Sequence, residues 1–196
     1  MTTSVEYYNS HAEQFFAGTN EVDMTDIYQR FLPLIPEGGS ILDAGCGSGR
    51  DAKAFKERGY DVDAFDASPT LVELANTANG LQATVDTFNS YTSLKDYDGI
   101  WACASLLHVP SGELAGAIQK LSNLLKDSGK FYLSFKMGSG EREADQRIFT
   151  DLTLERLSDI ISQVPNLRII DSWTTADLRP ERNDEWLNAI LERLSD

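Results

Sequence analysis

Three glycines at alternate positions within residues 40–51 constrain the fold of this chain more than any other feature. An apolar run at 40–42 ends in Asp43, and a pattern of helical periodicity begins at Arg50. Between them lie Gly45, Gly47 and Gly49. A strand, a tight turn and a helix start present backbone N–H groups, and glycine lets a ligand approach the backbone without a Cβ in the way. The segment therefore predicts a site for a nucleotide-like cofactor after the first strand.

The glycine spacing and the preceding acid indicate which cofactor this is. Dinucleotide-binding turns have the spacing G-x-G-x-x-G and hold a pyrophosphate at the helix N-terminus. Here the spacing is G-x-G-x-G, and Asp43 stands two residues before the first glycine. A carboxylate at this point repels a pyrophosphate but attracts an ammonium or sulfonium group. A glycine-rich turn that binds nothing is the alternative.

A second acidic residue follows one strand later. Residues 60–65 have the pattern of a strand that ends at Asp66, 17 residues after Gly49. An acid about twenty residues beyond the glycines is placed to accept hydrogen bonds from two ribose hydroxyls. Alternatively Asp66 caps the next helix, but Ser68 followed by Pro69 is a better cap. We therefore expect Asp66 to hold a ribose.

In combination, Asp43, Gly45, Gly47, Gly49 and Asp66 resemble the motifs of class I S-adenosylmethionine-dependent methyltransferases. The resemblance extends over nearly the whole chain and is nearest to small-molecule enzymes of the tellurite-resistance and ubiquinone-biosynthesis type. It implies S-adenosyl-L-methionine as cofactor and an acid after the third strand that binds the adenine amino group. On this resemblance, the further residues expected beside the cofactor are Cys46, Ala67, Ser68, Asp86, Thr87, Phe88 and Ala104.

Strand and helix patterns alternate along the 196 residues, which predicts an α/β domain with a mostly parallel sheet. Helices are expected near 5–16, 24–34, 50–58, 69–78, 111–125 and 152–163, and strands near 40–42, 60–65, 83–85, 99–104, 130–135 and 167–173. Residues 186–191 fit a strand or a short helix; the resemblance favours an antiparallel strand. We expect a single domain over 1–196, with a Rossmann-like doubly wound core at 39–196 and an N-terminal helical lid at 1–38.

The acidic composition excludes several partners. With 17 Lys and Arg against 31 Asp and Glu, the net charge is −14, which disfavours nucleic acid and anionic membrane surfaces. No apolar stretch is long enough for a membrane span, and the first residues lack the pattern of a secretion signal. The two cysteines favour a reducing cytoplasm over a disulfide framework, and no Cys/His spacing predicts a metal site.

Candidate catalytic residues lie in two segments. His108 follows the fourth strand, where parallel sheets carry their sites, and imidazole is suited to act as a general base near neutral pH. A structural role for His108 is the alternative. Tyr8 and His11 belong to the expected lid and are candidates for contact with the substrate, unless this helix only packs on the sheet.

Five cations in the last third of the chain form a candidate anion site. They are Lys136, Arg142, Arg147, Arg179 and Arg182. If they converge above the sheet, Lys136, Arg147 and Arg179, together with Tyr8, are expected to bind an anionic substrate, because arginine forks suit carboxylate or phosphate. The alternative is a set of surface cations paired with neighbouring acids.

The expected function is methyl transfer from S-adenosylmethionine to a small molecule by in-line displacement. Nucleic-acid amino methyltransferases carry an Asn/Asp-Pro-Pro-aromatic motif where this chain has Ala104-Ser105-Leu106-Leu107. The rivals are a protein that binds the cofactor or its demethylated product without turnover, and a nicotinamide-dependent oxidoreductase. The sequence leaves open the acceptor atom, the need for a general base and the oligomeric state.

Overall fold

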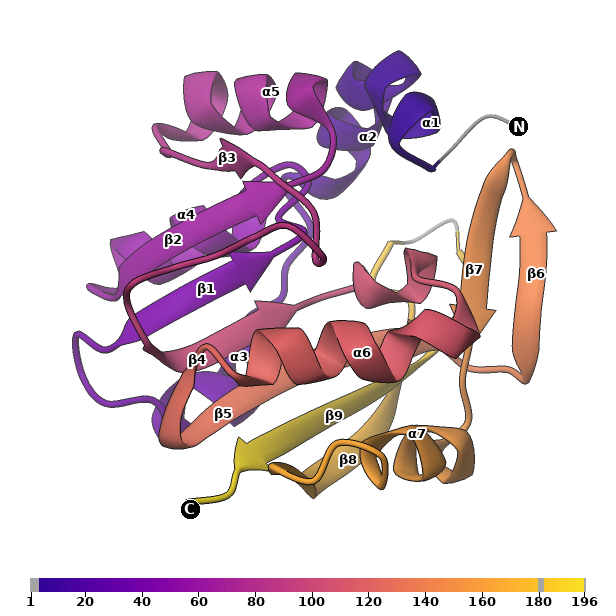
Figure 1. The fold of residues 1–196 in the computed structure, drawn as a ribbon. Coiled ribbons are helices and arrows are strands. Elements are labelled where there is room, and N and C mark those ends of the chain that lie inside the picture. The colour runs from indigo at the N-terminus through magenta and orange to yellow at the C-terminus, as the bar shows by residue number, and fades with distance from the viewer. Residues whose placement is uncertain (1–3, 180–181, 196) are drawn as a thin grey trace.

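The computed structural model describes residues 4–179 and 182–195 and contains a seven-stranded sheet in the order β3-β2-β1-β4-β5-β9-β8 (Figure 1). The residues 1–3 at the start of the expected lid lie outside the described part. The strands of this sheet are β1 (Ser40–Ala44), β2 (Asp61–Asp66), β3 (Thr84–Val85), β4 (Tyr97–Ala102), β5 (Leu125–Lys136), β8 (Leu167–Ala176) and β9 (Glu185–Arg193).

The direction of the strands confirms the predicted fold class. Strands β1 to β5 pair in parallel, with Leu42 opposite Asp63 on one side and Ile100 on the other. Strand β9 lies antiparallel between β5 and β8, so residues 186–191 belong to a strand and not to a helix. The strand order reverses between β1 and β4. In open α/β sheets, ligands bind at such a switch point, beyond the carboxyl ends of the strands.

Helices cover both faces of the sheet, as expected for a doubly wound fold. In Figure 1, α6 and α7 lie in front of the sheet, while α3 and α4 lie behind it. The helices are α1 (Ser4–Ser10), α2 (Ala12–Thr19), α3 (Thr25–Phe31), α4 (Arg50–Glu57), α5 (Pro69–Asn79), α6 (Ser111–Ser122) and α7 (Leu154–Ile161), with short 3₁₀ turns at Leu32–Leu34 and Leu106–His108.

Alternation along the buried strands sends apolar side chains to both faces. Leu42, Ile100 and Phe131 belong to the core beneath α6 and α7. Trp101 and Tyr132 point the other way, toward α3 and α4, and their rings stack at 3.9 Å between centroids. The sheet is thus buried on both faces. The side of the fold that the helices on these faces leave open is formed by the carboxyl ends of the strands.

The single helix expected near 5–16 is two helices, because the backbone of His11 leaves the helical region at φ −119° and ψ 20°. The hydroxyl of Ser10 donates to the carbonyl oxygen of Glu6 at 2.8 Å, and such local bonds compete with regular helix geometry. The two helices lie above the carboxyl ends of β1 and β2 (Figure 1).

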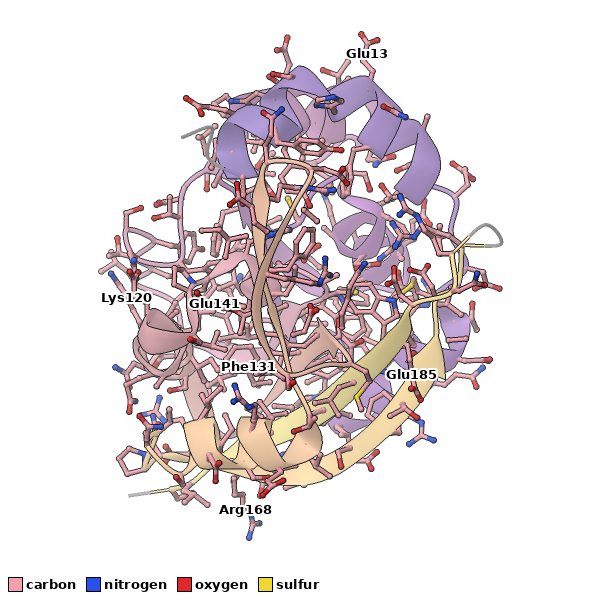
Figure 2. The ribbon with its side chains drawn as sticks, turned by 90° about the vertical axis from the view of Figure 1, so that its right-hand side faces the viewer. Glu13, Lys120, Phe131, Glu141, Arg168 and Glu185 are labelled. Atoms are coloured by element: carbon pink, nitrogen blue, oxygen red, sulfur yellow. The ribbon has the colours of Figure 1, made fainter. Side chains whose placement is uncertain are left out.

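A second sheet, the hairpin of β6 (Gly140–Ala144) and β7 (Arg147–Asp151), was not expected from the sequence. Asp145 and Gln146 form its two-residue turn with φ of 50° and 63°, as a primed turn requires, without the glycine that usually marks one. Figure 2 looks onto the strand ends and shows this hairpin rising in front of the sheet to α1 and α2, with Glu13 pointing outward from those helices.

Within the described ranges, no helix combines the length and apolar character needed to cross a membrane.

Gly49 provides a stability test of the glycine turn. It caps α4 with φ +76°, and a Cβ there would lie 2.5 Å from Cδ1 of Leu81 and 2.9 Å from Cβ of Ala75. Gly59 has φ +89° with nothing within 4 Å of a Cβ. Gly59→Ala should cost about 1–2 kcal/mol of left-handed strain, and Gly49→Ala about 1–3 kcal/mol more for overpacking. Urea unfolding of both variants measures this; equal losses would contradict the packing assigned to Gly49.

Candidate cofactor and substrate cavity

A cavity of about 670 Å³ lies at the carboxyl ends of the strands, beneath α1 and α2 and beside the hairpin. Its volume falls in the range of roughly 300–1,000 Å³ typical of small-molecule sites. Most of the predicted site residues line it. They are Gly45, Cys46, Gly47, Asp66, Ala67, Ser68, Asp86, Thr87, Phe88 and Ala104 on one side, and Tyr8, His11, His108, Lys136, Arg147 and Arg179 on the other.

The glycine loop forms the floor of the cavity. Gly45 and Gly47 have φ of 80° and 53°, which glycine adopts without strain. The N–H groups of Gly45 and Cys46 both donate to the carbonyl oxygen of Phe65 at 2.9 Å, which ties the loop to the end of β2. A Cβ on Gly45 would lie 2.5 Å from Cβ of Ser105, so the loop also approaches the segment after β4 too closely for a side chain.

Asp66 stands between the loop and α5. Its carboxylate accepts hydrogen bonds from the N–H of Gly47 at 2.9 Å and of Ser68 at 2.8 Å. Burial raises the pKa of Asp66, and these backbone donors act against that rise. Ser68 caps α5 by accepting from the N–H of Leu71, as its position before Pro69 predicted. A carboxylate in the cavity wall that faces the loop in this way suits the hydroxyls of a ribose.

Asp43 and Gly49 are placed behind the loop and do not line the cavity. The carboxylate of Asp43 is 2 % exposed and accepts from the N–H of Ala52, in the first turn of α4. Burial and the neighbouring Asp51 raise the pKa of Asp43 well above its usual range. This contact fixes the start of α4 against β1, so the geometry gives Asp43 a supporting position relative to the loop.

The segment after β3 forms the next part of the same wall. The N–H of Asp86 donates to the carbonyl oxygen of Asp66 at 3.0 Å, and the side chain of Asp86 accepts from the N–H of Thr87 at 2.8 Å. The ring of Phe88 meets Phe65 edge-on, with 5.8 Å between centroids. Two carboxylates and an aromatic face therefore follow the glycine loop along one wall, and such acceptors beside a flat ring fit the hydroxyls of a ribose and the amino group and ring of an adenine.

Ala104 closes this wall at the end of β4. Its φ of 51° is uncommon for a residue with a side chain, and its N–H donates to Oγ of Ser134 at 2.9 Å. Backbone strain of this kind is concentrated at ligand sites.

In a second wall of the cavity, formed by α1, the turn after β4 and the start of β7, Tyr8 and His108 are hydrogen-bonded although a hundred residues separate them. Nδ1 of His108 lies 2.9 Å from the carbonyl oxygen of Ile148, which only accepts, so Nδ1 carries the proton of the neutral ring. Nε2 is then an acceptor for the hydroxyl of Tyr8, at 2.8 Å. Burial lowers the pKa of His108 to about 4 and raises that of Tyr8. His108 is therefore a neutral acceptor at physiological pH.

His11 lies at the outer rim of the cavity. It is exposed, its ring stacks on Tyr7 at 4.2 Å between centroids, and its Nδ1 lies 2.9 Å from the carbonyl oxygen of Tyr7. Both contacts are with Tyr7, so the ring of His11 is held against α1.

The predicted cations converge in part, and acids pair with most of them. Lys136 bonds Asp184 at 2.6 Å, Arg179 bonds Asp177 at 2.8 Å, and Arg142, which does not line the cavity, pairs with Asp151. Arg182 lines the cavity but is exposed. Arg147 differs, because its partner Asp145 is 73 % exposed and its buried Nε has no hydrogen-bond partner. Lys136, Arg142 and Arg179 thus match the alternative of cations paired with acids, and Arg147 is left as the candidate for an anion site.

Sequence reasoning did not identify the buried polar cluster around Asp51. Asp51 is 5 % exposed and accepts from Nε of Arg50 at 2.6 Å, the hydroxyl of Tyr28 at 2.5 Å and Nε1 of Trp101 at 2.8 Å. Burial alone would raise the pKa of Asp51, but Arg50 and these donors lower it. The sequence signal that could have indicated this cluster was the pair of adjacent charges, Arg50 and Asp51, directly after the glycine turn.

Cys103 also lines the cavity beside this cluster. Burial raises the pKa of Cys103 to about 12, which keeps the thiol protonated.

Among the described residues, no group of three or more His, Cys, Asp or Glu side chains is arranged to hold a metal ion.

Comparison with known proteins identifies relatives of this chain. An uncharacterized methyltransferase of Staphylococcus carnosus is 24 % identical over 203 residues, 95 % of this chain and 98 % of its own length. A ubiquinone biosynthesis O-methyltransferase of Xanthomonas oryzae is 31 % identical over 105 residues, which are 50 % of this chain and only 43 % of that enzyme.

Solved structures show the same fold. The 1,6-didemethyltoxoflavin-N1-methyltransferase of Burkholderia thailandensis, solved with 1,6-didemethyltoxoflavin and S-adenosylhomocysteine, superposes with a TM-score of 0.79 at 21 % identity, over 97 % of this chain and 86 % of its own. A model of the methyltransferase domain family matches residues 13–177. The chain therefore belongs to the methyltransferase domain family, and it is an S-adenosylmethionine-dependent methyltransferase of class I, as the sequence motifs predicted.

Proposed function

We propose that this methyltransferase acts on a small anionic acceptor, which it encloses together with S-adenosylmethionine in the cavity at the strand ends. The observation that carries the proposal is that one cavity has two chemically distinct walls. One wall presents the glycine loop and the carboxylates of Asp66 and Asp86, and the other presents Tyr8 and Arg147.

We assign the first wall to the cofactor. Asp66 would hold the ribose hydroxyls, Asp86 and Phe88 the adenine, and the loop from Gly45 to Ser48 the aminoacyl end. When bound, S-adenosylmethionine supplies an electrophilic methyl carbon. The Burkholderia thailandensis enzyme, which shares the fold, was solved with S-adenosylhomocysteine, and this supports the assignment.

The second wall would position the acceptor for in-line attack. Methyl transfer disperses charge, so alignment and exclusion of water can supply much of the rate, on the order of 7–11 kcal/mol in favourable intramolecular models. Helices α1 and α2 would exclude water as a lid over a core at 39–196. Asn9 supports this role, since its Oδ1 accepts from the hydroxyl of Ser68 at 2.6 Å and so fastens α1 beside the cofactor wall.

For a hydroxyl acceptor, Tyr8 and His108 provide a route for the proton. If S-adenosylmethionine gives its methyl group to the acceptor oxygen, the bond from carbon to sulfur would break and sulfur would leave as a neutral thioether. The proton of the acceptor would pass to the oxygen of Tyr8, and the proton of Tyr8 to Nε2 of His108. Because the pKa of His108 is about 4, this imidazolium would hold the proton only transiently at neutral pH. An acceptor that is already nucleophilic needs no such step.

We also propose a cytoplasmic location for this enzyme, because its two cysteines are both unpaired.

Calorimetry with S-adenosylmethionine and with NAD separates the proposal from an oxidoreductase, since only the former should bind. Formation of S-adenosylhomocysteine on addition of small aromatic and aliphatic acids separates it from a protein that binds the cofactor without turnover. Absence of turnover with every acid, while neutral acceptors react, would overturn the anionic assignment.

Substitution of Asp66 tests the cofactor wall. Asp66→Ala removes acceptors for two ribose hydroxyls, and charge-assisted hydrogen bonds contribute roughly 1.5–3 kcal/mol each. We expect the affinity for S-adenosylhomocysteine, measured by calorimetry, to fall about a hundredfold to ten-thousandfold. Asp61→Asn is the matched control, because Asp61 begins the same strand, is 65 % exposed and pairs with Lys95 outside the cavity. Equal affinities in both variants would contradict the assignment of Asp66.

The buried state of His108 predicts a pH dependence of stability. The pKa of His108 is about 4 in the fold against 6.5 in the unfolded chain. Between these values the unfolded state binds more protons, so the fold loses stability as the pH falls. Relative to His108→Gln, the free energy of unfolding of the wild type should fall by about 3 kcal/mol from pH 7 to pH 4. Urea titrations at both values measure this, and a difference that is independent of pH would show that His108 is not buried as a neutral ring.

A further inference from the structure

We propose that the acceptor is a planar aromatic carboxylic acid, and that the guanidinium of Arg147 binds its carboxylate as an anchor. This inference rests on the proposed function and assigns one residue of the second wall to one chemical group. The acceptor atom that receives the methyl group is then a different atom of the same molecule.

Arg147 is the first residue of β7, and its side chain reaches the cavity with only 14 % of its surface exposed. Nη1 donates to the hydroxyl of Tyr8 at 3.3 Å, and Nη2 lies 3.2 Å from a carboxylate oxygen of Asp145. Nε is buried and has no hydrogen-bond partner. Buried polar groups are almost always paired, so an unpaired Nε in a cavity wall indicates a missing partner.

The free donors of Arg147 have the geometry of a carboxylate fork. Nε and Nη2 share one edge of the planar guanidinium, and Asp145 occupies only one of the two N–H groups of Nη2. Because Nε has almost no accessible surface in this structure, a small rotation of the Arg147 side chain must first expose this edge to the cavity. A carboxylate then accepts from Nε and Nη2 together, which is the bidentate arrangement that arginine forms best.

The charges of the wall favour a monoanion. Lys136 and Arg179 line the same cavity, but Asp184 and Asp177 already neutralise them. Asp145 is the ion partner of Arg147 and is largely exposed to water, where such pairs are weak. One guanidinium with an unpaired Nε matches the single charge of a carboxylate, whereas a phosphate dianion would retain an unbalanced charge in a partly desolvated site.

The surroundings of the guanidinium favour an aromatic ring on the acid. Its central carbon lies 4.0 Å from the ring centroid of Tyr7, 5.5 Å from that of Tyr8 and 5.0 Å from that of Phe149. A carboxylate bound to the fork is coplanar with the guanidinium, and an aryl group conjugated to it shares that plane. Aromatic side chains offer such a flat ligand offset-stacked and edge-to-face contacts.

Calorimetry on the protein saturated with S-adenosylhomocysteine tests the proposal with 2-naphthoate and its neutral analogue 2-naphthamide. We expect wild-type protein to bind 2-naphthoate about tenfold or more tightly than the amide, because the charged pair adds affinity that the amide lacks. Arg147→Met and Arg147→Gln should abolish this preference, because the acid loses more affinity than the amide, and should leave the affinity for S-adenosylhomocysteine unchanged. Arg147→Lys should retain only part of it, since a lysine lacks the fork.

Arg142→Met is the matched control. Arg142 is on the same hairpin, with its guanidinium carbon 4.5 Å from the ring centroid of Phe149, but it pairs with Asp151 and does not line the cavity. This variant should keep the preference for the acid. Equal binding of both probes, no binding of either, a preference that survives Arg147→Met, or formation of methyl 2-naphthoate from S-adenosylmethionine would each overturn the proposal. Failure of the wild type to bind S-adenosylhomocysteine would instead overturn the proposed function.

Discussion

The carboxylate of Asp66 is the point at which the loop, the sheet and α5 meet. It accepts from the N–H of Gly47 in the glycine loop and from the N–H of Ser68 at the start of α5. Ser68 in turn contacts Asn9 of α1. The shape of the cavity floor therefore depends on a buried acid that remains an acceptor, and Asp43 supports the same loop from behind through Ala52. These hydrogen bonds fix the loop relative to β2 and α5.

The second wall depends on contacts between distant parts of the chain. Tyr8 from α1, His108 from the turn after β4 and Arg147 from the hairpin meet at one point, with Tyr8 bonded to both of the others. None of these elements alone forms a site. Because the helices and the hairpin close over the strand ends together (Figure 2), movement of α1 would open both the cofactor wall and the acceptor wall.

The sequence allowed prediction of the sheet and of the wall nearest the glycine loop, because both follow from local patterns. Alternate glycines with an acid on the next strand specify a turn and its neighbour, and parallel strands bring their carboxyl ends together. The hairpin was missed because residues 140–151 are rich in charge and lack the glycine of a primed turn, so tertiary contacts decide their pairing. The supporting position of Asp43 and the distinction of Arg147 from Lys136 depend on burial and ion partners, which no sequence pattern specifies.

A crystal structure of the protein with S-adenosylhomocysteine would show which wall of the cavity holds the cofactor. We expect the ribose hydroxyls within hydrogen-bond distance of Asp66, the adenine beside Asp86 and Phe88, and the sulfur facing the space bounded by Tyr8 and Arg147. An adenosyl group bound against the hairpin, or a ligand whose sulfur points away from Tyr8, would contradict this expectation.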